Sequence, residues 1–181
     1  MPDETREETD QAAPAEESEP RPLPEEPTLV GLLEAYEDAH WHLSHGQHVV
    51  VLPRELQSEF AGAAHESGFE MLADLTAVDY LGVRRVRFEV VTNLLSIEHG
   101  IRLRIVCAVP ADDTTIPSVV GVYPGANFFE REVYDMFGIT FEGHPDMTRI
   151  LMPDDWEGHP LRKDFGVGTV PVQFKEANKV T

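Results

Sequence analysis

Hydrophobic positions along the first half of the chain predict alternating helices and strands. From Thr28, a residue type that caps helices, apolar residues recur at helical spacing as far as Tyr36. Residues 47–52 form a continuous apolar run that Pro53 stops, and this predicts a buried strand. A second helix is expected over residues 54–65, before Gly68.

The middle of the chain predicts strands over residues 69–80, 83–93 and 100–109. The second and third alternate between apolar and charged residues, with arginines and a glutamate between the apolar positions. This alternation favours an antiparallel pair with one solvated face, joined by a loop at 96–99.

A third helix is expected over residues 127–137, with Asn127 as its cap and Gly138 after its end. Its periodicity separates two faces. The apolar face holds Phe129, Val133, Met136 and Phe137, and the outer face holds Glu130, Arg131, Glu132 and Asp135. Arg131 and Asp135 are four residues apart, so we expect them to pair on that outer face.

These patterns predict an α+β fold. The expected sheet is small, mixed and largely antiparallel, with helices on one face and an extended C-terminal arm. We expect a disordered acidic tail over residues 1–27, an α+β domain over 28–141, and a partner-docking arm over 142–181.

Charge and cysteine content exclude several classes of protein. The 181 residues carry 33 acidic and 14 basic side chains, a net charge of −19, which disfavours binding to nucleic acid or anionic lipid. The single cysteine, Cys107, excludes a disulfide framework, a four-cysteine iron–sulfur cluster and a cysteine-based zinc site within this sequence. No apolar stretch is long enough for a membrane span or a secretory leader, so we expect a cytoplasmic location.

Two clusters of residues could in principle support metal binding or acid–base chemistry. The first consists of His40, His42, His45 and His48, whose spacing resembles a metal-ligand cluster. Because Ser44 and Gly46 interrupt any helix there, we interpret these histidines as part of a surface loop. The second consists of Glu130, Glu132, Asp135, His144 and Asp146. Since positions 130 and 132 point apart on a helix, this cluster is interpreted as surface charge, and no nucleophile motif is present.

The segment over residues 154–165 combines aromatic, apolar and cationic side chains without periodicity. Trp and Arg are the residue types that anchor protein interfaces, so this segment is a candidate for docking to another protein. The alternative is that Trp156 and Leu161 pack back on their own domain, and composition does not separate the two.

A run of motifs is similar to one known family. The motifs are Glu130-Arg-Glu-x-x-Asp-Met-Phe-Gly, then Gly-His-Pro at 143–145, Arg-Ile-Leu at 149–151 and Pro-Leu-Arg-Lys-Asp at 160–164. With weaker support from a strand ending in Val78-Asp79, this run resembles the 30 kDa subunit family of proton-pumping NADH-quinone oxidoreductase (respiratory complex I), also called its C-type subunits. The family usually has Trp where this chain has Phe128, a change that keeps the aromatic bulk.

The resemblance implies a cofactor-free structural subunit and no catalytic, cofactor-binding or metal-binding residues in this chain. It implies a place beside the D-type subunit that helps to form the quinone site, with the B and I subunits as further partners and with FMN and iron–sulfur clusters in partner subunits. It also implies a peripheral location on the cytoplasmic side of the membrane. The residues that carry the signature or an interface are Glu130, Arg131, Glu132, Asp135, His144, Pro145, Arg149, Trp156, His159, Pro160, Leu161, Arg162, Lys163 and Asp164.

The same signature is shared by related complexes, which leaves the electron donor open. These alternatives are quinone reductases fed by ferredoxin or reduced coenzyme F420 and membrane-bound energy-converting hydrogenases. A stand-alone enzyme using Glu130, Asp135 or His144 is the remaining class. We further expect Arg131 to tie the signature helix either to the arm or to the quinone-site subunit.

Overall fold

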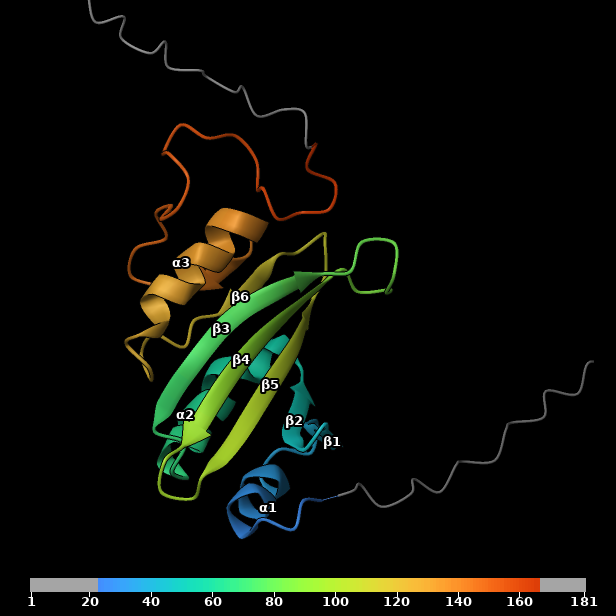
Figure 1. The fold of residues 1–181 in the computed structure, drawn as a ribbon, viewed down its shortest axis with the longest axis vertical. Coiled ribbons are helices and arrows are strands. Elements are labelled where there is room, and N and C mark those ends of the chain that lie inside the picture. Colours follow the sequence, from blue (N-terminus) through green and yellow to red (C-terminus); the bar gives the residue numbers. More distant parts are fainter. Residues whose placement is uncertain (1–22, 167–181) are drawn as a thin grey trace, which may run out of the picture.

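A five-stranded sheet with helices packed on one side forms the body of the molecule (Figure 1). The structure is a computed structural model that describes residues 23–166. In chain order its elements are α1 (Pro27–Glu34), β1 (His40–Ser44), β2 (Gln47–Leu52), a 3-10 turn (Arg54–Leu56), α2 (Gln57–Glu66), β3 (Met71–Asp79), β4 (Phe88–Ser96), β5 (Ile101–Val109), β6 (Thr115–Pro117), α3 (Ala126–Phe137) and β7 (Thr140–Glu142).

The strands of the main sheet lie in the order β1-β2-β5-β4-β3. Only β2 and β5 pair in parallel, and the other three pairs are antiparallel. β6 and β7 form a separate parallel pair. The prediction of an α+β fold with a mixed, largely antiparallel sheet is therefore confirmed, as is the hairpin of β4 and β5.

One face of the sheet forms the core. In β5 the buried side chains are Leu103, Ile105, Cys107 and Val109, and the first of them alternate with the exposed or half-buried Arg102 and Arg104. The buried side chains of β2, β4 and β5 share one core cluster with those of α1, α2 and α3. Burial of these apolar surfaces is the main stabilising contribution, and it leaves the other face of the sheet without a covering helix among residues 23–166.

Both expected helix caps differ from the structure. Helix α1 starts at Pro27, whose fixed φ suits the first helical position, so Thr28 lies inside the first turn and is not the cap. Helix α3 starts at Ala126, because the amide of Ala126 already bonds the carbonyl of Tyr123, so Asn127 is helical and not the cap. The predicted stop at Gly138 is confirmed, with φ of 70°.

The expected strand over residues 83–93 begins later than predicted. The amide groups of Val83 and Arg84 both donate to the carbonyl of Tyr80, which closes a turn, and β4 starts only at Phe88. Arg87 therefore belongs to the connection between β3 and β4, and its side chain does not follow the alternation of a strand.

The histidine run is also not a loop. His40 and His42 lie on β1, where they pair in register with Val51 and Val49 of β2. His48 lies on β2 and pairs with Leu43 of β1 and Leu103 of β5. Only His45, with φ of 50°, occupies the turn. Among residues 23–166, no group of three potential metal ligands is positioned to hold an ion.

Residues 143–166, called the arm below, contain no helix or strand and run along α3 at the upper end of the molecule in Figure 1. No helix in the described part of the chain has the length and apolar character needed to cross a membrane. Of the acidic tail predicted over residues 1–27, residues 1–22 lie outside the described residues, and Pro27 already begins α1. The last part of the predicted arm, residues 167–181, also lies outside the described residues.

Candidate docking site on helix α3 and the arm

Helix α3 buries two of the acids that were predicted to lie on its outer face. Glu130 and Asp135 are fully buried, whereas Glu132 is exposed. The prediction of an outer acidic face is therefore wrong for Glu130 and Asp135. A buried carboxylate is stable only when hydrogen-bond donors surround it, and each of these two binds a segment that wraps over the helix.

Asp135 fastens the arm to α3. Its Oδ2 accepts hydrogen bonds from the amide groups of Ile150, Leu151 and Met152 at 3.1, 2.7 and 2.8 Å. Its Oδ1 accepts from the guanidinium of Arg149 at 2.6 Å. Burial alone would raise the pKa of Asp135, but the amide donors and Arg149 outweigh it, and the pKa lies below its ordinary value.

Arg131 strengthens the same attachment from the next turn of the helix. Its guanidinium donates to the carbonyls of Thr148 and Arg149, each at 3.0 Å. The expected pairing of Arg131 with Asp135 is therefore wrong, because both side chains bind the backbone of the arm instead. Of the two roles expected for Arg131, the structure shows the tie to the arm.

Glu130 holds a different segment, the connection between β6 and α3. Its carboxylate accepts from the hydroxyl of Ser118 and the amide of Val119, both at 2.7 Å. Burial raises the pKa of Glu130 to about 7, and the two hydrogen bonds oppose this only in part. Glu130 thus keeps its proton between about pH 4.5 and about pH 7, a pH range in which an exposed glutamate is ionised.

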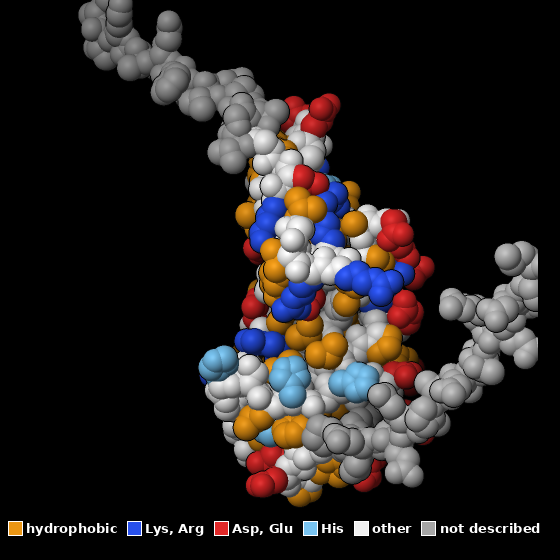
Figure 2. All heavy atoms as spheres, turned by 90° about the vertical axis from the view of Figure 1, so that its right-hand side faces the viewer, with side chains coloured by type: hydrophobic (Ala, Val, Ile, Leu, Met, Phe, Trp, Pro, Cys, Tyr) orange, Lys and Arg blue, Asp and Glu red, His pale blue; other side chains and the backbone are white. Residues whose placement is uncertain are grey.

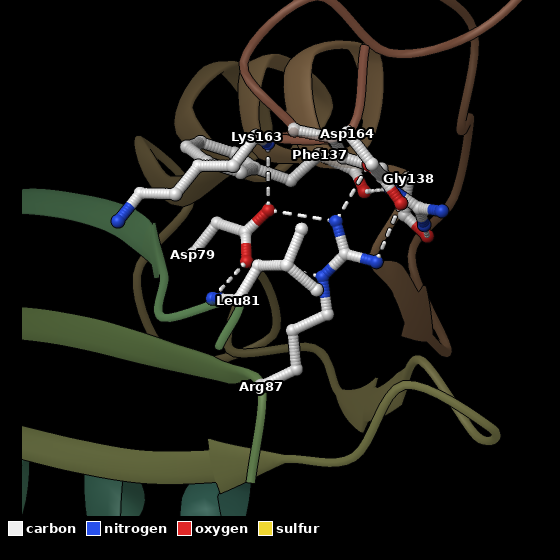
Figure 3. A network of polar contacts seen from close by, with 8 residues as sticks. Asp79, Leu81, Arg87, Phe137, Gly138, Lys163 and Asp164 are labelled. Carbon is white, nitrogen blue, oxygen red and sulfur yellow. Dashed lines mark hydrogen bonds and ion pairs between the residues drawn. The ribbon is translucent and has the colours of Figure 1, made fainter. Parts of the chain in front are cut away.

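A second fastening point joins the end of the arm to the β3–β4 connection (Figure 3). The guanidinium of Arg87 donates to Asp79 at 3.0 and 2.8 Å and to Asp164 at 2.8 and 2.7 Å. Asp79 also accepts from the amides of Lys163 and Leu81, both at 2.9 Å. Arg87 therefore bridges two acids that lie far apart in the sequence.

The charges at this second point stabilise one another. The pKa of Asp79 is lowered to about 2, mainly by the hydrogen bonds from Arg87 and then by those from the amides of Lys163 and Leu81. Burial opposes this shift only in part. The side chains of Asp79 and Arg87 are 2% and 13% exposed, whereas that of Asp164 is 51% exposed. The Asp79–Arg87 pair is consequently the stronger part of this contact.

The C-terminal end of α3 is covered by the last part of the arm. The amide of Leu161 donates to the carbonyl of Met136, and the guanidinium of Arg162 donates to the carbonyl of Phe137. These groups satisfy carbonyls that the end of a helix leaves unpaired. Gly138 allows the close approach, because a side chain there would overlap the ring of His159.

His159 and Trp156 pack within their own chain. The Nδ1 of His159 lies 3.0 Å from the carbonyl of Asp135, its ring meets Tyr134 edge-on, and burial lowers its pKa. The ring of Trp156 stacks on Phe165, with ring centres 6.4 Å apart. Trp156 therefore packs within the arm itself, whereas Leu161 remains 53% exposed, so these contacts do not decide between docking to another protein and packing on the domain.

The remaining predicted residues lie on the outer parts of the arm. His144 has its Nε2 3.3 Å from the carbonyl of Asn127, and its Nδ1 accepts from the amide of Asp146. Pro145 is exposed and Pro160 is half-buried. Glu130, Asp135 and His144, the residues suggested for a stand-alone enzyme, therefore bind three different backbone segments.

Asp79 and Arg87 are the important residues that sequence reasoning did not place. Asp79 was recognisable only as the end of a predicted strand, and Arg87 only as a charged residue of the solvated face. No local spacing relates either residue to Asp164, so no pattern within a single element could have identified this contact.

Exposed apolar side chains follow α3 and the arm. Phe128 is 60% exposed at the start of α3, and Leu151 is 61% exposed beside the amides that bind Asp135. Ile150 and Leu161 are also exposed. We call these four residues the arm surface. The arm is thus fixed by buried polar contacts while it presents apolar groups to solvent, an arrangement typical of a docking site.

A comparison with family models matches residues 50–170 to the family described as respiratory-chain NADH dehydrogenase, 30 kDa subunit. Among curated proteins, the C-type subunit of NADH-quinone oxidoreductase from Salinispora arenicola is 53% identical over 109 residues, which cover 60% of this chain and 44% of that protein. NADH-quinone oxidoreductase subunit 5 of Thermus thermophilus is 45% identical over 139 residues, which cover 72% of this chain and 67% of that protein. The matched region thus spans less than half the length of the first of these relatives.

Two solved structures are similar in fold. A trypsin-resistant fragment of Nqo5 matches with a TM-score of 0.61 and 39% identity, over 66% of this chain and 98% of that chain. A chain of the membrane-bound sulfane sulfur reductase, described as an archaeal respiratory membrane complex, matches with a TM-score of 0.68 and 27% identity. That match covers 83% of this chain and 95% of the other.

Proposed function

Because the chain belongs to the 30 kDa subunit family of respiratory-chain NADH dehydrogenase, we propose that it is a cofactor-free structural subunit of the peripheral arm of a proton-translocating NADH-quinone oxidoreductase. In this role it sits next to the D-type, quinone-site subunit and also contacts the B and I subunits. The chain supplies a rigid docking site for the assembly, while the whole complex transfers electrons from NADH to quinone.

The observation that carries this proposal is the way the arm is held. An extended segment without helix or strand, residues 143–166, is fixed at Asp135 and again at Asp79, both buried, so contacts within the chain hold it in place. Fixing a segment in advance reduces the ordering entropy that binding would otherwise cost. The exposed apolar side chains of the arm surface then supply the area that a partner buries.

The chemistry of the chain supports a structural and not a redox role. Its single thiol, Cys107, is fully buried in the core, and burial raises its pKa well above the ordinary value. A thiol in that state is a poor metal ligand, because ligation requires the thiolate. In the proposed complex, FMN and iron–sulfur clusters belong to partner subunits. The chain is held peripherally, on the cytoplasmic side of the membrane, through these partners.

A second candidate is the equivalent subunit of a related complex. The similarity to a chain of an archaeal sulfane sulfur reductase supports the use of this fold in a respiratory membrane complex with another electron acceptor. The candidates are a ferredoxin- or F420H2-fed quinone reductase and an energy-converting hydrogenase. NADH- and flavin-binding subunits that co-purify with the chain would favour the first proposal over this one.

We expect substitution of Leu151 by Gln to weaken binding to the quinone-site subunit about tenfold or more, since removal of a buried apolar anchor typically costs about 2 kcal/mol. The change can be measured as the dissociation constant of the purified pair. Ile97→Gln is the matched control, because Ile97 is 66% exposed at the other end of the sheet and should be neutral. Equal affinities of Leu151→Gln and wild type would contradict the proposed docking site.

A further inference from the structure

A hollow of about 520 Å³ lies at the end of the sheet that carries α1. Figure 1 shows α3 and the arm at the opposite end of the sheet. It forms where the β1–β2 turn, the β4–β5 turn and the chain before α1 meet. Its polar lining is supplied by Glu26, His45, Gln47, His48, His99 and Arg102. Figure 2 shows that His side chains gather on one face of this half of the molecule.

Two hydrogen-bond donors in this hollow lack a protein partner within residues 23–166. The side chain of Arg102 is exposed and forms no hydrogen bond or ion pair there, whereas that of Arg104, on the same face of β5, binds Asn93. The indole of Trp41 donates to Nδ1 of His48 at 3.2 Å, and indole nitrogen can only donate. Neutral His48 therefore carries its proton on Nε2, which is left to bind an acceptor.

A guanidinium and imidazole N–H groups grouped in this way suit a carboxylate. Arg binds carboxylates through paired hydrogen bonds. Glu26 is the one acid in the lining, and it is exposed and forms no hydrogen bond through its side chain within residues 23–166.

The chain itself supplies the matching ligand close by. Residues 1–22 contain eight acids and two arginines, and Glu16, Glu17 and Glu19 lie within ten positions of Glu26. An extended chain covers about 3.3–3.6 Å per residue, so these three acids can reach the hollow. Tethering also gives an effective concentration on the order of millimolar, which allows weak contacts to form.

We propose that the hollow at the α1 end binds the carboxylates of Glu16, Glu17 and Glu19 of the same chain, with Arg102 as the principal anchor. This binding is independent of the docking proposed for α3 and the arm, because the two sites lie at opposite ends of the sheet. Since Arg102 is exposed, the contact is weakened by salt: the Debye length falls from about 10 Å at about 0.1 M to about 3 Å at about 1 M.

The test compares amide NMR shifts of the full-length chain and its variants at low salt. Gly46 and Gly100 in the two turns serve as reporters because both line the hollow. We expect the triple variant E16Q/E17Q/E19Q to shift both amides, and we expect R102Q to do the same. The matched controls, E4Q/E7Q/E8Q and R85Q, should leave both amides in place.

Three results would each overturn this proposal. The first is that E16Q/E17Q/E19Q leaves the amides of Gly46 and Gly100 unmoved. The second is that E4Q/E7Q/E8Q produces shifts of equal size, which would indicate general screening by an acidic segment. The third is that the difference between wild type and variant depends on protein concentration, which would assign the ligand to a second copy of the chain.

Discussion

Substitution of Asp135 by Ala should release the arm from helix α3. The change leaves the guanidinium of Arg149 and the amides of Ile150, Leu151 and Met152 without their shared acceptor. Loss of one partner of a buried ion pair costs about 3–5 kcal/mol. Because the arm adds no strand to the main sheet, we expect most of this loss to appear as local opening. Amide hydrogen exchange should therefore accelerate at positions 149–152 and remain slow in β4 and β5.

The matched control for this prediction is Asp154→Ala. Asp154 lies in the same arm, and its side chain is exposed and has no partner among residues 23–166. Its replacement should leave exchange rates and thermal stability at wild-type values. Unchanged exchange at positions 149–152 in Asp135→Ala would show that the arm is held by other contacts, and the proposed docking site would then need to be abandoned.

Substitution of Glu130 by Gln should make the folded chain more stable than the wild type by an amount that grows as the pH rises. In the folded chain Glu130 binds its proton up to a pH of about 7, whereas the unfolded chain releases it near 4.5. The stability from this group is therefore complete below about pH 4.5 and is lost as the pH rises through about 7. Gln does not titrate and can accept from Val119 while it donates to Ser118. We expect the difference in unfolding free energy between Glu130→Gln and wild type to grow in favour of the variant by about 1–3 kcal/mol between about pH 5 and about pH 8.

Glu132→Gln provides the control on the same helix, because Glu132 is exposed. Its unfolding free energy should follow that of the wild type at every pH. Denaturant titrations at several pH values measure all three proteins. A difference between Glu130→Gln and wild type that stays constant over the whole pH range would mean that the pKa of Glu130 is the same in the folded and the unfolded chain, contrary to its burial.

The strands and their alternation could be predicted because they depend on local patterns. The apolar run over 47–52 and the alternation along residues 100–109 appear in the structure as β2 and β5. Helix starts were less accurate, since Pro27 and the turn at Tyr123 decide them through backbone geometry. The parallel pairing of β2 with β5 agrees with the prediction of a mixed sheet, but no local pattern specified the order of its strands.

The contacts that fix the arm could not be predicted, because they join distant parts of the chain. The helical pattern correctly separated apolar from charged positions on α3, but amphipathicity assigns every charged residue to solvent. Glu130 and Asp135 are exceptions since each satisfies the amides of another segment. The family motif marked both residues as important, and only the fold explains why.

The proposed role as a structural subunit of a respiratory NADH-quinone oxidoreductase can be tested in the host cell. The experiment is to tag the chain, to extract the membranes gently, and to identify the co-purifying proteins while NADH:quinone reduction is assayed. We expect recovery with the D, B and I subunits and with flavin- and iron–sulfur-containing subunits, together with NADH-dependent activity. Recovery with a hydrogenase-like set of subunits and no NADH-oxidising partner, or recovery of the chain alone, would contradict the proposed role.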